Sequence, residues 1–179
     1  MPALDLISTV LNLLIDTLRT HVQGVLVRNP GWESALADFQ VESAWMIGAW
    51  DDVHKIAANE HHHGPSMVKA RVLLAMRSDD LSLIEESLTR ARVVLGTPIA
   101  ASGTNGYRRA YDALVDLHMI HELELIHEVV RNLPPSSQGR KSAILTLSQI
   151  LSARLDYTLP TFRIHVSLLS MRRTAFALR

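Results

Sequence analysis

The feature that most constrains this chain is the recurrence of apolar residues every three or four positions. The clearest case lies between Gly106 and Glu124, where one stripe has offsets of 0, 3, 4, 7 and 11 residues, as on one face of an α-helix. Its members are Tyr107, Ala110, Tyr111, Leu114 and His118. The dipeptide Asn105-Gly106 before it is typical of a turn. Because similar stripes fill the chain, the sequence predicts an all-α fold.

Composition supports this prediction and excludes several classes of site. Hydrophobic residues make up 47% of the 179 residues, which is enough apolar material for a sizeable core. Eighteen basic residues balance eighteen acidic ones, so no overall field attracts nucleic acid or an anionic membrane. Cysteine is absent, which excludes disulfides, thiolate zinc sites and cysteine nucleophiles. We therefore expect no direct nucleic-acid partner and no membrane partner.

The beginning of the chain is apolar, so we first ask whether it is a signal peptide. Nothing basic precedes its apolar run, and Asp5, Asp16 and Arg19 interrupt it, so a signal peptide is disfavoured. The spacing instead predicts a helix over residues 3–27. Because residues off its main stripe are also apolar, we expect this helix to be buried on several sides.

Turn signals divide the rest of the chain into further helices. They are expected at about residues 33–47, 51–59, 66–77, 80–95, 106–118, 120–132, 140–156 and 160–179. The helices at 106–118 and 120–132 could be one, since no breaker separates them. We expect loops over 59–65 and 97–105, and a proline-containing linker over 132–139.

Helix pairs in this reading begin at intervals of roughly 30–40 residues, the range of helical-hairpin repeats. The predicted fold is therefore an α-solenoid of tetratricopeptide-like antiparallel helix pairs. It is one helical-repeat segment over residues 1–179, with a sub-boundary at the 132–139 linker. The last predicted helix has no polar cap, and solenoids need polar capping repeats, so we expect a fragment of a much longer chain.

A repeat-like phrase lies between Trp45 and Asp51. A Trp followed three or four residues later by a Gly partly matches the first helix of a tetratricopeptide repeat. In this interpretation Trp45 fills the gap between paired helices, and Gly48 lets a neighbouring helix approach closely. Trp50 belongs to the same phrase.

Few residues suggest chemistry. His118, His121 and Glu122 could supply a zinc site with a general base, but no His-Glu-x-x-His phrase occurs. His118 lies on the apolar stripe, where a core histidine bonded to a carbonyl is more common. The run His61-His62-His63 is typical of a solvated loop. No nucleophile elbow, phosphate-binding glycine loop or kinase motif is present. The sequence predicts no catalytic, cofactor-binding or metal-binding residue.

Two stretches carry a family resemblance. The first runs from Val41-Glu42-Ser43-Ala44-Trp45 to Trp50-Asp51-Asp52-Val53. The second consists of Tyr107, Arg109, Tyr111, Leu117-His118-Met119 and Glu122-Leu123-Glu124. A third and weaker similarity lies at 168–173. In order and spacing, over about residues 14–179, they resemble the FAT region of the ATR-type checkpoint kinases. These kinases are large members of the phosphatidylinositol-3-kinase-related family.

The resemblance implies a function that composition and spacing do not. It implies a non-catalytic α-solenoid that links an N-terminal solenoid to a Ser/Thr kinase domain in nuclear DNA-damage signalling. The implied partners are the kinase domain and neighbouring repeats of the same chain, with a checkpoint partner subunit. We accordingly expect six residues to be structural: Trp45, Gly48, Trp50, Tyr107, Tyr111 and His118.

Two other functions remain open at this point. The chain could be an independent helical-repeat adaptor that binds a protein partner in a concave groove. It could also be a metal-dependent enzyme built on His118, His121 and Glu122. A kinase domain encoded downstream would favour the scaffold, whereas an immediate stop codon would favour the adaptor.

Overall fold

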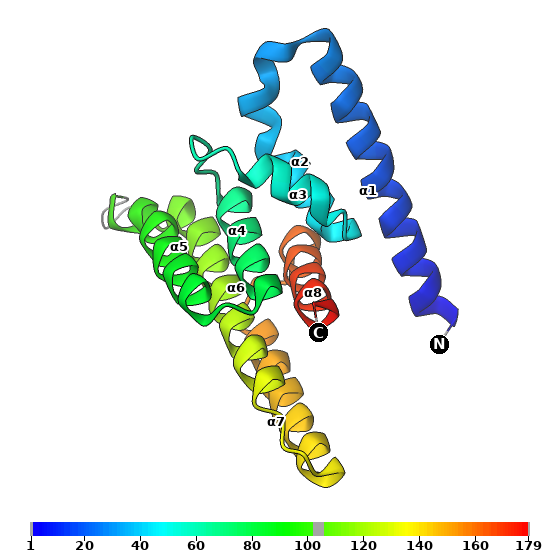
Figure 1. The fold of residues 1–179 in the computed structure, drawn as a ribbon, viewed down its shortest axis with the longest axis vertical. Helices are drawn as coiled ribbons and strands as arrows, with labels where there is room; N and C mark the ends of the chain where they lie inside the picture. Colours follow the sequence, from blue (N-terminus) through cyan, green and yellow to red (C-terminus); the bar gives the residue numbers. More distant parts are fainter. Residues whose placement is uncertain (1, 102–105, 179) are drawn as a thin grey trace. The chain divides into compact units, whose positions relative to one another are not determined.

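The computed structural model describes residues 2–101 and 106–178, and only the backbone of residues 2–8, 10–12, 108 and 109. In these ranges it contains helices and turns but no strand, which confirms the predicted all-α fold (Figure 1). The helices are α1 (Pro2–Arg28), the 3-10 helix η1 (Pro30–Trp32), α2 (Glu33–Ile47), α3 (Trp50–Ala57), α4 (Pro65–Ser78), α5 (Leu81–Ala101), α6 (Tyr107–Arg131), α7 (Ser137–Asp156) and α8 (Phe162–Ala177).

Most predicted helix boundaries lie within a few residues of the observed ones, but α5 is longer than expected. The Gly96-Thr97-Pro98 sequence was expected to end it, yet the helix continues to Ala101. A proline removes only one backbone donor, and here it does so close to the end of the helix. The hydroxyl of Thr97 also donates to the carbonyl of Val93, 2.8 Å away, in the same turn. The rest of the predicted 97–105 loop, residues 102–105, lies outside the described residues.

Side-chain caps define where three helices begin. Asp80 caps the start of α5, because its Oδ1 accepts from the backbone nitrogen of Ser82 at 2.9 Å. Ser136 and Thr161 accept in the same way from Gly139 and Ile164 at the starts of α7 and α8. The predicted linker at 132–139 is correspondingly shorter, since α7 already begins at Ser137.

The chain divides into two compact units, residues 1–74 and 75–179. The first contains α1 to α3 and most of α4, and the second contains the end of α4 and α5 to α8. The sub-boundary predicted at 132–139 lies inside the second unit.

In the first unit, α2 packs against both α1 and α3. Val41, Ala44 and Trp45 on α2 are at most 2% exposed. Two acidic residues of α2 also hold the start of α4: Asp38 accepts from the backbone nitrogen of Met67 at 3.2 Å, and Glu42 accepts from the hydroxyl of Ser66 at 2.9 Å. Negative charge at a helix N-terminus is favourable, so these contacts fix where α4 begins.

Helix α1 contradicts the expectation of burial on several sides. Of its described side chains Val22 is buried, but Leu14 and Leu18 are 61% and 51% exposed. An ion pair between Arg19 and Asp52 ties α1 to α3. The apolar side chains of Leu4, Ile7 and Leu11, which also belong to the predicted helix, lie outside the described side chains. No helix in the described part of the chain has both the length and the apolar character to cross a bilayer.

In the second unit, α6 is a single helix that packs against α5, α7 and α8 (Figure 1). Hydrogen bonds connect α6 to α8 and to the turn before α8. They join Tyr111 to Leu159, Asp112 to Arg163, and Glu122 to Arg172, so the residue numbers rise together in the two segments. Helices α6 and α8 are therefore parallel. Helices α6 and α7 are joined by the short turn at 132–136 and pack against each other, so they form an antiparallel pair of the predicted kind (Figure 1).

The buried face of α6 differs from the predicted stripe. Tyr107 and Leu114 are 70% and 40% exposed, which contradicts their inward assignment. The buried positions on α6 are Ala110, Val115, Met119, Ile120, Glu122, Leu123 and Ile126. The central buried positions are 115, 119, 122 and 126, which are shifted by one residue from the predicted stripe. A shift of one residue corresponds to a rotation of about 100° around the helix axis. Three packed neighbours make the buried face wide, and periodicity alone could not place its centre.

Candidate functional site: a buried ion cluster on α6

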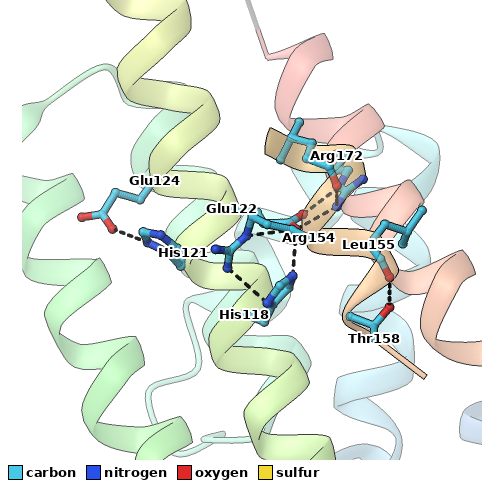
Figure 2. A network of polar contacts seen from close by, with 9 residues as sticks. His118, His121, Glu122, Glu124, Arg154, Leu155, Thr158 and Arg172 are labelled. Atoms are coloured by element: carbon cyan, nitrogen blue, oxygen red, sulfur yellow. Dashed lines mark hydrogen bonds and ion pairs between the residues drawn. The ribbon is translucent and has the colours of Figure 1, made fainter. Parts of the chain in front are cut away.

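Four polar side chains from three helices meet inside the second unit (Figure 2). His118 and Glu122 come from α6, Arg154 from α7 and Arg172 from α8. Because residues four apart share a helix face, His118 and Glu122 point to the same neighbours. Glu122 is 2% exposed and Arg172 is 8% exposed, so the centre of the cluster is removed from water.

Arg172 binds Glu122 through two parallel hydrogen bonds. Its Nε donates to Glu122 Oε2, and its Nη2 donates to Glu122 Oε1, both at 2.7 Å. The same Nη2 also donates to the backbone carbonyl of Leu151 on α7, 2.8 Å away. A two-pronged arginine–carboxylate pair fixes orientation as well as distance. One guanidinium thus holds α6, α7 and α8 in register.

His118 connects the carboxylate to a second arginine. Its Nε2 lies 2.9 Å from Glu122 Oε1, and its Nδ1 lies 3.1 Å from Arg154 Nη2. Arginine can only donate, so Nδ1 is the acceptor in this contact. His118 therefore bridges Glu122 and Arg154, and is not a histidine bonded to a carbonyl.

The electrostatics of the cluster favour an ionised Glu122. Burial by itself would raise the pKa of this carboxyl, but hydrogen bonds and charge attraction from Arg172, together with His118, outweigh it. The result is a pKa lowered from 4.5 to about 2. Arg154 Nε adds a more distant contact, 3.5 Å from Glu122 Oε1.

His121 belongs to a separate contact on the α5 side. It is 52% exposed, and its Nδ1 lies 3.4 Å from Glu124, which also accepts from Arg92 of α5 at 2.5 Å. The hypothetical zinc site therefore divides, because His121 does not join His118 and Glu122. Nowhere in residues 2–101 and 106–178 do three or more histidine or acidic side chains lie together in a way that could hold a metal ion.

The other structural residues expected from the sequence occupy varied environments. Trp45 is 2% exposed inside α2, and Trp50 is half-buried in the first turn of α3. Gly48 has φ 78° and lies at the end of α2, so it is the left-handed cap of this helix. It was expected instead to let a neighbouring helix approach α2 closely. Tyr111 accepts from the backbone nitrogen of Leu159 at 2.8 Å, whereas Tyr107 projects outward.

Sequence reasoning missed both arginines of the cluster. The sequence signal was weak, since Arg172 only follows Met171, an apolar residue of the last predicted helix. The partner could not be identified, because Glu122 lies 50 residues earlier. Arg172 is 8% exposed although charged side chains are mostly exposed, because it is paired with Glu122. The side chains of the pair Arg108-Arg109 are outside the description.

Comparison with known proteins places these helices in a family. Residues 37–179 match the sequence profile described as the FAT domain. The chain belongs to the FAT domain family. Over 97% of its length this FAT segment is 27% identical to the serine/threonine-protein kinase ATR of Oryza sativa subsp. japonica. Over 94% of its length it is 29% identical to the serine/threonine-protein kinase ATR of Arabidopsis thaliana.

A more distant likeness extends beyond the ATR proteins. Over 70% of its length the FAT segment is 26% identical to the serine/threonine-protein kinase TOR2 of Saccharomyces cerevisiae. The chain spans about 7% of the length of the rice and Arabidopsis relatives, and the profile it matches is that of the FAT domain. No solved structure matches it significantly.

Proposed function

We propose that this FAT segment is a non-catalytic helical scaffold of an ATR-like Ser/Thr protein kinase in DNA-damage checkpoint signalling. In this role it links an N-terminal solenoid to the kinase domain and acts in the nucleus. Its partners are the kinase domain and neighbouring repeats of the same polypeptide, together with a checkpoint partner subunit. Support comes from the family match and from relatives that carry the name ATR.

The single observation that carries the proposal is the buried cluster around Glu122. A scaffold that transmits position must resist sliding of its helices past one another. Apolar packing alone is non-directional, whereas two parallel hydrogen bonds of 2.7 Å tolerate little displacement. Because Arg172 also binds Leu151 at 2.8 Å, moving α7 or α8 along α6 would leave a buried charge without a partner. The cluster is suited to mechanical fixation of the three helices.

The proposal is tested on the natural polypeptide that contains this chain. An antibody against the exposed face of α7 recovers that polypeptide from cells, and its size, nuclear content and phosphorylation of a Ser/Thr peptide are measured before and after DNA damage. We expect a polypeptide many times longer than this chain, present in nuclei, with kinase activity that rises after damage. A free polypeptide of about 20 kDa without kinase activity would instead establish the independent adaptor.

A second step separates scaffolding from mere presence in the same polypeptide. Arg172→Met in the full-length protein should lower phosphorylation per folded molecule, because α6 to α8 lose their fixed register. Arg163→Ala is the matched control, since its ion pair with Asp112 is exposed on both sides. Equal kinase activity of the two variants at equal folded amounts would refute the transmission role.

A further inference from the structure

The first part of helix α7 is covered by its neighbours on one side only. Of residues 137–150 only Leu147 is buried, whereas Ile144 and Leu145 are 51% and 61% exposed. The start of α7 and the end of α6 extend together beyond α5 and α8 (Figure 1). The described chain therefore leaves most of this part of α7 in contact with water, including two large apolar side chains.

The outward residues of α7 form two parallel ridges. One ridge consists of Ser137, Lys141 and Leu145, and the other consists of Ile144, Ser148 and Ser152. At about 100° per residue these six positions fall on one side of the helix, turned away from Leu147. We call them the α7 outer face. Ridges with a spacing of four residues enclose a groove that receives a ridge of a second helix, so this face is shaped for helix packing.

The sequence around the α7 outer face carries charge of one sign. Between Glu128 and Asp156 there is no acidic residue, but there are four basic ones. These are Arg131, Arg140, Lys141 and Arg154. Because the whole chain has no net charge, this excess is local to the end of α6 and to α7.

Three of these basic side chains are available to a partner. Arg131, Arg140 and Lys141 are exposed, and their side chains make no ion pair or hydrogen bond with any residue that the structure describes. Exposed arginines on other helices of this unit, such as Arg92 and Arg163, are paired with carboxylates. The surface beside the two apolar side chains of α7 is therefore positively charged, and it is complementary to an acidic partner.

We propose that the α7 outer face binds an acidic amphipathic helix of a partner protein. Apolar side chains of that helix lie against Ile144 and Leu145, and its aspartate or glutamate residues pair with Lys141 and with Arg140 at the edge of the face. A second copy of α7 fits less well, because it brings the same positive charges and no carboxylate. The site is separate from the Glu122 cluster, which lies on the inward side of α7, and it does not depend on the function proposed above.

The proposal is tested with three designed helical peptides of 20 residues, the length of α7. All have the same leucine stripe, and the positions beside it hold glutamate in the first peptide, glutamine in the second and lysine in the third. Binding to the purified chain is measured by fluorescence anisotropy. We expect the glutamate peptide to bind up to about tenfold more tightly than the glutamine peptide, through two exposed ion pairs, and the lysine peptide to bind most weakly. Equal binding of the three peptides, or binding of none, would overturn the proposal.

Variants of the chain locate the contact. Arg140→Glu combined with Lys141→Glu should reverse the order of the three peptides, whereas Arg90→Glu, at an exposed position on α5, should leave it unchanged. Leu145→Glu should abolish binding of all three. Circular dichroism of each variant establishes that it is folded. Binding that survives Leu145→Glu, or an equal effect of Arg90→Glu, would place the peptide elsewhere and overturn the proposal.

Two other occupants of this face are tested with the same chain. Sedimentation without peptide tests a second copy, and a dimer that Leu145→Glu dissociates would show that α7 pairs with itself. Flotation with phosphatidylserine vesicles tests an anionic membrane. We expect neither the dimer nor binding to vesicles, and either result, if lost in the Leu145→Glu variant, would overturn the proposal of a partner helix.

Discussion

At the scale of single residues, the second unit depends most on how Glu122 is paired. Its carboxylate is 2% exposed and accepts two hydrogen bonds from Arg172. The nearby pair of Arg163 and Asp112 has a similar distance, 2.6 Å, but its side chains are 74% and 63% exposed. When the exposed pair of Arg163 and Asp112 breaks, water solvates both charges. When the buried pair of Arg172 and Glu122 breaks, no water is available to do so. Similar distances therefore have different energetic consequences.

Removing Arg172 should therefore destabilise the second unit strongly. Arg172→Met retains much of the apolar volume but leaves a buried carboxylate with only the longer contact to Arg154 and the imidazole of His118. We expect a loss of about 3–5 kcal/mol in the free energy of unfolding, measured by urea denaturation. Arg163→Ala should cost no more than about 1 kcal/mol. Similar losses for the two variants would contradict the importance of burial.

Glu122 should also make the second unit sensitive to acid. Its folded pKa of about 2 lies below the ordinary value of 4.5, because Arg172 and His118 together overcome the opposing effect of burial. The unfolded chain therefore binds the proton more readily, and the stability contributed by the ionised group is complete above about pH 4.5. It is lost as pH falls from that value towards about 2.

The measurement is urea denaturation followed by circular dichroism across this pH range. Glu122→Gln should be less stable than the wild type near neutral pH and should lose less stability on acidification. Glu85→Gln, at an exposed position on α5, is the control. If Glu122→Gln had the same slope with pH as the wild type, the carboxylate would not be the acid-sensitive group.

At the scale of elements, local sequence signals predicted where the helices begin and end, but not which helices pack against each other. The cap at Asp80 and the turn sequence Asn29-Pro30-Gly31 depend only on nearby residues, and both lie at observed helix boundaries. Contacts such as Asp38 with Met67, 29 residues apart, depend on how helices meet. The same limit explains the misplaced face of α6, because three neighbours, and not periodicity, decide which side of that helix is buried.

Helix α1 should make the isolated chain self-associate. Leu14 and Leu18 are one turn apart and more than half exposed, and contiguous apolar surface of this kind associates in water. Changing both to lysine should shift the sedimentation coefficient of the purified chain towards that of a monomer, with little change in helix content. The control changes Thr17 and Thr20, exposed polar residues of the same helix, to lysine. Equal self-association of both variants would place the contact on another surface.

At the scale of the whole molecule, the chain divides into two compact units, residues 1–74 and 75–179. Trp45 belongs to the core of the first unit, and the Glu122 cluster lies in the second. The sequence predicted a boundary at 132–139 because Pro134 and Pro135 are adjacent there. In the structure this segment contains the turn between α6 and α7, whose helices pack against each other. Proline marks a break in a helix, and packing decides whether a unit ends there.

Core substitutions should therefore act on one unit at a time. Trp45→Ala removes a ring that is 2% exposed and should cost about 3–5 kcal/mol in the first unit, whereas Arg172→Met should act in the second. All three Trp residues lie in residues 1–74 and all three Tyr residues in residues 75–179, so near-ultraviolet circular dichroism distinguishes the units.

Thermal melting of the purified chain, followed at tryptophan and at tyrosine wavelengths, provides the test. We expect Trp45→Ala to lower the midpoint of the tryptophan transition by at least several degrees and to move the tyrosine transition much less, with the reverse for Arg172→Met. Hydrogen exchange should locate the lost protection in α2 and α3 for the first variant and in α6 to α8 for the second. If each substitution moved both transitions equally, the chain would unfold as one cooperative body. The division into two units would then describe contacts and not stability.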